Sequence, residues 1–89
     1  MLTDSEEREL REAVEQGRRA QIVREFMKEF LLEARTQTIS RLEQDSFNDS
    51  DELLAPIVYL RTLRLFELDV EKYISLGEIA EGRLNEDGE

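Results

Sequence analysis

Carboxylates and guanidinium groups are the main reactive side chains of this 89-residue sequence, which has 22 Asp and Glu residues against 12 Lys and Arg. Paired carboxylates can act as general acid and base, but only in a cleft that shifts the pKa of one of them. The sequence contains no Cys, no His and no Trp. Disulfides, thiol nucleophiles, Ser-His-Asp triads and Cys/His zinc sites are therefore excluded.

The acids between residues 45 and 52 have some likeness to a calcium loop. Such a loop requires the pattern D-x-[DN]-x-[DN]-G, but Phe47 stands at the third position and no Gly supplies the turn. We expect these acids to cap the following helix instead, with Asp49 and Glu52 at capping-box spacing and Ser50 as an alternative cap. The sequence therefore predicts no metal site and no cofactor.

The sequence has one basic cluster, which lies between acidic segments and contains Arg18, Arg19, Arg24 and Lys28. A nucleic-acid surface needs continuous positive potential and exposed aromatic side chains around such a cluster. We expect the cluster to pair with the chain's own acids or with a protein partner, and direct nucleic-acid binding is not predicted. The four glycines are scattered and form no phosphate-binding loop. The sequence thus predicts a protein that is not an enzyme.

The net charge of −10 is distributed unevenly along the chain. Residues 1–16, 44–52 and 77–89 each carry a net charge of −4, whereas residues 17–43 carry +2 and residues 53–76 are neutral. Most of the large apolar residues lie in the two segments that are close to neutral. These two segments are therefore expected to form the folded part of the protein.

Residues 18–43 and 50–76 each predict a long helix. In the first, apolar residues recur every three or four positions, as expected for one helical face: Val23, Met27, Phe30 and Ala34. The second helix has a comparable row, which runs through Leu53, Ile57, Leu60, Leu63, either Phe66 or Glu67, Val70 and Ile74. Pro56 is expected to kink this helix near its start or to mark a short separate first turn. Gly77 is expected to end it, because glycine is common just after a helix.

These two helices have matching lengths of about 40 Å at 1.5 Å per residue, and a short connection joins them. The sequence therefore predicts an all-α fold, an antiparallel helical hairpin. We expect residues 1–16 to form an acidic helical extension, set off from the hairpin by Gly17, and residues 78–89 to form an acidic, largely mobile tail. Within that tail, Ile79 is expected to pack back on the hairpin.

Both predicted helices carry more apolar surface than one neighbouring helix can cover. A lone two-helix hairpin is also too small to offset its chain entropy comfortably. We therefore expect the hairpin to be completed by oligomerisation into a helical bundle, or by docking on a larger protein assembly. The interaction residues predicted from this second apolar row are Phe26, Leu31, Leu54, Val58, Leu65 and Leu68.

The longest uninterrupted apolar runs, Leu53–Ala55 and Ile57–Leu60, are too short to cross a bilayer. The N-terminal residues are acidic, unlike the basic and apolar start of a signal peptide. The sequence therefore predicts no membrane partner and a cytoplasmic location.

The order of these features resembles that of short helical-hairpin proteins encoded by tailed bacteriophages, which accompany the packaging and head genes. The likeness is carried by an acidic helical start, two long helices, and three short segments: Gly17-Arg18-Arg19-Ala20, Asn48-Asp49-Ser50-Asp51 and Ile74-Ser75-Leu76-Gly77-Glu78-Ile79-Ala80. Pro56 and the long acidic extension depart from that pattern. The resemblance implies an assembly or accessory role in a virion, head or packaging complex, located in the host cytoplasm or the virion.

The strong negative charge allows an alternative function, in which the protein mimics nucleic acid and inhibits a host DNA-binding protein. A net charge of −10 would steer the chain towards basic surfaces. The acids, however, concentrate at the ends of the predicted helices and do not form evenly spaced rows along them. We therefore favour the assembly role.

Overall fold

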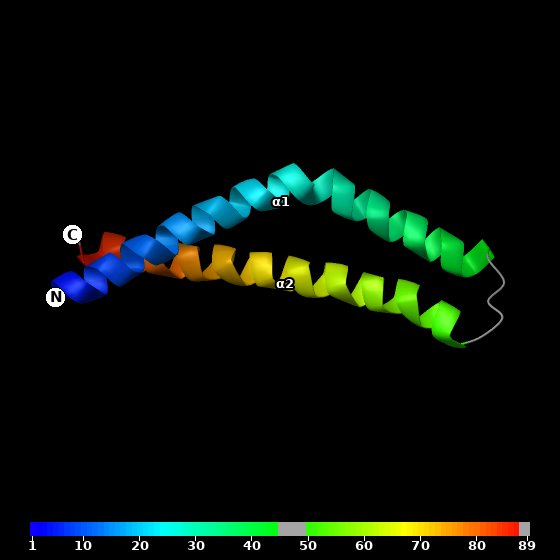
Figure 1. The fold of residues 1–89 in the computed structure, drawn as a ribbon. Coiled ribbons are helices and arrows are strands. Elements are labelled where there is room, and N and C mark those ends of the chain that lie inside the picture. Colours follow the sequence, from blue (N-terminus) through cyan, green and yellow to red (C-terminus); the bar gives the residue numbers. More distant parts are fainter. Residues whose placement is uncertain (45–49, 88–89) are drawn as a thin grey trace.

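The computed structural model describes residues 1–44 and 50–87, and nearly all of them lie in two helices (Figure 1). Helix α1 spans Asp4–Gln44 and helix α2 spans Ser50–Asp87. The helices run in opposite directions and pack against each other, so that both termini lie at one end of the molecule (Figure 1). No strand occurs within the described ranges. The predicted all-α antiparallel helical hairpin is confirmed.

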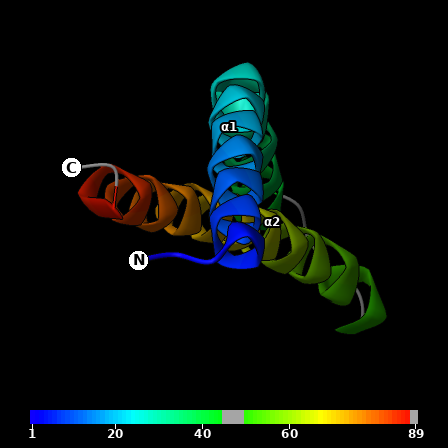
Figure 2. The same ribbon diagram turned by 90° about the vertical axis from the view of Figure 1, so that its left-hand side faces the viewer.

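The hairpin is long and thin, with principal extents of 63 × 22 × 14 Å. Its radius of gyration is 19.2 Å, against about 12 Å for a compact chain of this length. Helix α1 is bowed over its middle turns (Figure 1), and the two helices cross when they are seen from the end that holds the termini (Figure 2). Because there is only one pair of helices, each side chain that does not point at the partner helix faces outward.

The residues between the two helices, which we call the seam, recur at the three- and four-residue steps of a coiled coil. They are buried or half-buried, whereas most of their neighbours are exposed. The seam of α1 consists of Leu10, Ala13, Gly17, Ala20, Met27, Leu31, Ala34 and Thr38. The seam of α2 consists of Pro56, Leu60, Leu63, Glu67, Val70, Ile74, Gly77, Ala80 and Leu84.

The helix boundaries predicted at Gly17 and Gly77 are wrong, because each glycine lies inside a continuous helix. The two glycines instead mark a close approach of the helix backbones. A Cβ atom built on Gly17 would lie 2.9 Å from the Cα atom of Gly77 and 3.0 Å from the carbonyl oxygen of Tyr73. Glycine costs a helix about 1 kcal/mol relative to alanine, and here the close packing of the two helices offsets that cost.

Residues 4–16 of the predicted extension and residues 78–87 of the predicted tail are helical and lie against each other. Leu10 and Ala13 are half-buried at the start of α1, and Ala80, near the end of α2, is only 3% exposed. The expectation that Ile79 packs back on the hairpin is wrong, since this side chain is 61% exposed. The uninterrupted helix directs Ala80 towards α1 and leaves Ile79 outside. Mobility of the tail stays a prediction.

Helix α1 begins with a side-chain cap at Thr3 that the sequence prediction missed. The side-chain oxygen of Thr3 accepts a hydrogen bond from the backbone N–H of Glu6, with a donor–acceptor distance of 3.1 Å. The T-x-x-E spacing of these two residues is the signal that could have identified it. Helix α2 begins at Ser50, as predicted, and continues through Pro56 without interruption. Phe47 and Asp49 lie outside the described residues.

Truncation of α2 tests how much its last turns contribute. We expect a chain that ends after Leu84 to keep its thermal stability, whereas a chain that ends after Gly77 loses Ala80 and Leu84 and uncovers the first turns of α1. The loss is expected to be about 2 kcal/mol, which corresponds to roughly 10 °C in Tm for a chain of this size. Circular dichroism melting curves measure it, and equal Tm values for the two truncations would contradict this packing.

Candidate interaction surfaces

The hairpin has little enclosed interior. The apolar side chains that it buries are Ala20, Leu31, Leu63, Ile74 and Ala80, and no large side chain among the described residues is completely enclosed. Large apolar side chains remain on the outside along both helices. Contiguous exposed apolar surface of this kind marks sites at which proteins bind other proteins.

The structure separates the six predicted interaction residues into three places. Leu31 lies in the seam, where it follows Met27 by four residues, and it is only 9% exposed. It therefore adds nothing to the outer surface, contrary to its assignment to a second apolar row. Phe26 is exposed on α1, and the remaining four residues are exposed on α2: Leu54, Val58, Leu65 and Leu68. Their role in binding stays a prediction.

Those four α2 residues form one surface, which we call the leucine stripe. Their spacing of three, four or seven residues places them on one face of α2. None of them belongs to the seam, and their exposed fractions range from 47% to 56%. Arg61 occupies the middle of the stripe. The leucine stripe therefore combines four aliphatic side chains with one central cation.

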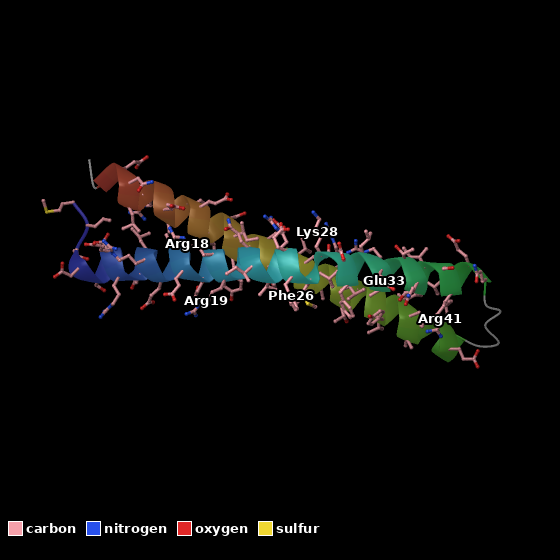
Figure 3. The ribbon with its side chains drawn as sticks, turned by 90° about the horizontal axis from the view of Figure 1, so that it is seen from above. Arg18, Arg19, Phe26, Lys28, Glu33 and Arg41 are labelled. Atoms are coloured by element: carbon pink, nitrogen blue, oxygen red, sulfur yellow. The ribbon has the colours of Figure 1, made fainter. Side chains whose placement is uncertain are left out.

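A second surface, which we call the phenylalanine face, lies on α1 and consists of Ile22, Val23, Phe26 and Phe30. Phe26 is 84% exposed and Ile22 is 68% exposed, so these large apolar side chains project into solvent. Figure 3 shows Phe26 and Lys28 on opposite sides of α1. Of this face, only Phe26 was among the predicted interaction residues, and Val23 and Phe30 were assigned to the same row as Met27 and Ala34.

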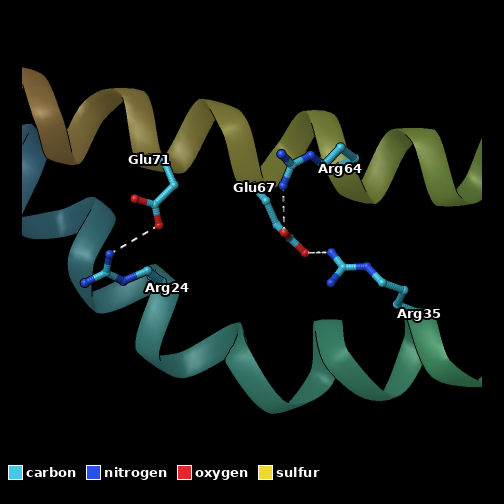
Figure 4. A network of polar contacts seen from close by, with 5 residues as sticks. All are labelled: Arg24, Arg35, Arg64, Glu67 and Glu71. Carbon is cyan, nitrogen blue, oxygen red and sulfur yellow. Dashed lines mark hydrogen bonds and ion pairs between the residues drawn. The ribbon is translucent and has the colours of Figure 1, made fainter.

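The flank of the hairpin opposite the phenylalanine face carries ion pairs between the helices. Arg24 contacts Glu71 at 3.2 Å, and Glu67 lies between Arg35 and Arg64 (Figure 4). Glu67 occupies a seam position of α2 and is half-buried, so its pairing with Arg35 compensates part of its lost hydration. The ion pairs that join the two helices in their middle turns therefore lie on this flank, away from the phenylalanine face.

The basic cluster pairs with acids of its own chain, one of the two roles predicted for it. Arg19 contacts Glu15 at 2.6 Å within α1, and Arg18 lies 3.6 Å from Glu81 of α2. These pairs are exposed to solvent, where each contributes at most about 1 kcal/mol. These ion pairs neutralise much of the positive charge that a nucleic-acid surface would require.

A hollow of about 420 Å³ lies between the helices beside the ion pairs. Its lining combines Leu31, Leu32 and Leu68 with cations and carboxylates from both helices. Among the described residues, no group of three or more acidic side chains is placed to hold a metal ion. The hollow is an open groove between the two helices.

Over its described length, neither helix has a stretch that is apolar enough to span a membrane. Comparison of the chain with protein-family models, with characterised proteins and with solved structures finds no significant match. The features of the molecule that bear on its function are the two exposed surfaces and the charge distribution.

Proposed function

We propose that this protein is a non-enzymatic assembly protein, which acts by packing its exposed helical surfaces against other helices. The observation that carries the proposal is the amount of surface left uncovered. The chain exposes 7250 Å², whereas a compact protein of its 10.5 kDa mass exposes about 5,400 Å². The surplus exceeds the roughly 800 Å² that one partner buries in a standard protein interface.

We propose further that the assembly is part of a tailed bacteriophage, as a virion, head or packaging accessory component. The order of the sequence features supports this proposal, and a helical hairpin is the fold that the resemblance implies. Such a role needs no cofactor, and it would place the protein in the host cytoplasm or in the virion. Its partners would be other copies of the chain or a larger protein assembly.

The assembly role predicts that the protein does not remain a lone chain in solution. At micromolar concentration, light scattering should give a mass of at least two chains, and addition of host extract should move the protein into a larger complex. Replacement of Leu65 and Leu68 by Lys should prevent that larger complex, because two cations would replace apolar contacts. A well-folded protein that stays monomeric alone and in extract would overturn the proposal.

One observation favours nucleic-acid mimicry as a second candidate function. The hairpin brings residues 1–16 and 77–87 to the same end of the molecule (Figure 1). These segments carry −4 and −3 of the net charge of −10, so most of the net charge lies at that end. A compact acidic end of this kind would attract the basic surface of a DNA-binding protein.

Salt dependence distinguishes the two candidates. Binding of a mimic to a basic target should weaken steeply with ionic strength, because charges are screened over roughly 8–10 Å at 0.1–0.15 M salt. Packing of apolar helix faces should change little over the same range. Elution of a captured partner at modest salt, together with competition by duplex DNA, would favour the mimic and contradict the assembly role.

A further inference from the structure

We infer that the phenylalanine face is an interface between two copies of this chain, in which the two α1 helices pack antiparallel about Phe26. The inference rests on the proposed assembly role and names the partner as a second copy. Phe26 is 84% exposed, with Ile22 and Phe30 on the same face of α1. Burial of such side chains on association is worth about 25 cal/mol per Å² of apolar surface.

Charges at the edge of this face are arranged to complement a second copy. Arg19 lies seven residues before Phe26 and Glu33 lies seven residues after it, so all three share one side of α1. In an antiparallel pair centred on Phe26, Arg19 of each copy therefore lies opposite Glu33 of the other. A parallel pair would place like charges against each other, which is unfavourable.

The distribution of net charge also favours the antiparallel arrangement. Residues 1–16 and 77–87 lie at one end of the hairpin and together carry −7, whereas residues 50–52 at the other end carry −2. An antiparallel dimer places the more acidic end of one copy beside the less acidic end of its partner. It thereby avoids direct contact between the two most acidic ends.

The leucine stripe does not offer the same complementarity to a second copy. Arg61 lies seven residues after Leu54 and seven residues before Leu68. Antiparallel self-packing about the middle of this stripe would therefore place Arg61 against Arg61 of the second copy. Since the phenylalanine face has no charged residue at its centre, it is the surface that fits a second copy.

Charge reversal at the two edge residues tests the interface. We expect Arg19→Glu and Glu33→Arg each to weaken dimerisation about tenfold, because two attractive pairs become repulsive. The double variant should restore the dissociation constant to within about threefold of the wild-type value. Sedimentation equilibrium at low salt measures these constants.

This design separates specific pairing from net-charge repulsion. Arg19→Glu changes the net charge from −10 to −12, and Glu33→Arg changes it from −10 to −8. Repulsion between net charges alone predicts that the first substitution weakens the dimer and the second strengthens it. Opposite effects of the two single variants, or a double variant as weak as either single one, would overturn the inference.

Two further variants control for the change in charge and for folding. Arg11→Glu makes the same charge change and breaks an equivalent pair, since Arg11 contacts Glu7 at 2.7 Å just as Arg19 contacts Glu15. It lies outside the phenylalanine face and should leave the dimer intact. Phe26→Glu should abolish the dimer while far-ultraviolet circular dichroism still reports a helical chain, because this side chain makes little contact within its own hairpin.

The outcomes distinguish failure of this interface from failure of the assembly role. A dimer that survives Phe26→Glu but is lost when Leu65 and Leu68 become Lys would overturn the inference and leave the assembly role standing. A wild-type protein that is monomeric alone but enters a larger complex in extract would likewise overturn the inference and leave the assembly role standing. Monomeric behaviour in both settings would overturn the two together.

Discussion

Replacement of Gly77 by Leu is expected to lower the free energy of unfolding by about 2–3 kcal/mol. A Cβ atom on Gly77 would lie 2.9 Å from the Cα atom of Gly17 and 3.1 Å from the carbonyl oxygen of Ala13. Both neighbours are backbone atoms of a helix, so they cannot rotate away as a side chain could. Overpacking usually costs about 1–3 kcal/mol and occasionally more, and contact with a rigid backbone places this substitution at about 3–4 kcal/mol. The gain of about 1 kcal/mol from replacing glycine in a helix offsets part of that cost.

The same substitution at Gly82 provides a matched control in the same helix. A Cβ atom on Gly82 has no neighbouring atom within 4 Å, so only the gain in helix propensity remains. Gly82→Leu should therefore raise stability by up to about 1 kcal/mol. The two variants should shift the midpoint of chemical unfolding in opposite directions at equal protein concentration. A shift of the same sign and size would show that the helices do not meet at Gly17 and Gly77.

Ile74→Ala is expected to cost about 2–4 kcal/mol of unfolding free energy. Ile74 lies in the seam and is only 4% exposed, which makes it the most deeply buried large side chain of the described residues. Removal of its outer carbon atoms loses the free energy gained by burying them. It also leaves a cavity between two helices that have few other buried contacts. Urea unfolding at a fixed protein concentration measures the loss, since association would add a concentration dependence.

Ile79→Ala is the corresponding control, with the same change of side chain five residues later in α2. Ile79 is 61% exposed, so its truncation should change stability by no more than about 0.5 kcal/mol. Comparable losses for the two variants would contradict the placement of the seam. They would support the earlier expectation that Ile79 packs back on the hairpin.

The helical hairpin itself could be predicted from the sequence, for reasons that are local. Apolar residues at three- and four-residue steps, the polar turn between residues 44 and 50, and two segments of matching length all indicate two antiparallel helices. The absence of Cys and His likewise excludes whole classes of site without reference to any structure. These properties depend on residue type and spacing alone.

The tertiary structure decided which apolar row of α1 faces inward. The sequence offers overlapping rows with the same helical spacing, and one of them mixed Val23 and Phe30 with Met27. In the hairpin, Met27 belongs to the seam, whereas Val23 and Phe30 lie on the outer phenylalanine face. Periodicity identifies a face, but only the position of the partner helix selects one of two adjacent faces.

The two seam glycines are the second feature that the sequence alone left undecided. Glycine is common just after the end of a helix and is also the residue that lets two backbones approach closely, so Gly17 and Gly77 were compatible with either role. The choice depends on residues 60 positions apart in the chain, because each glycine makes room for the other. Length, charge and helical spacing were thus determined locally, whereas the crossing point and the exposed surfaces follow from how the two helices meet.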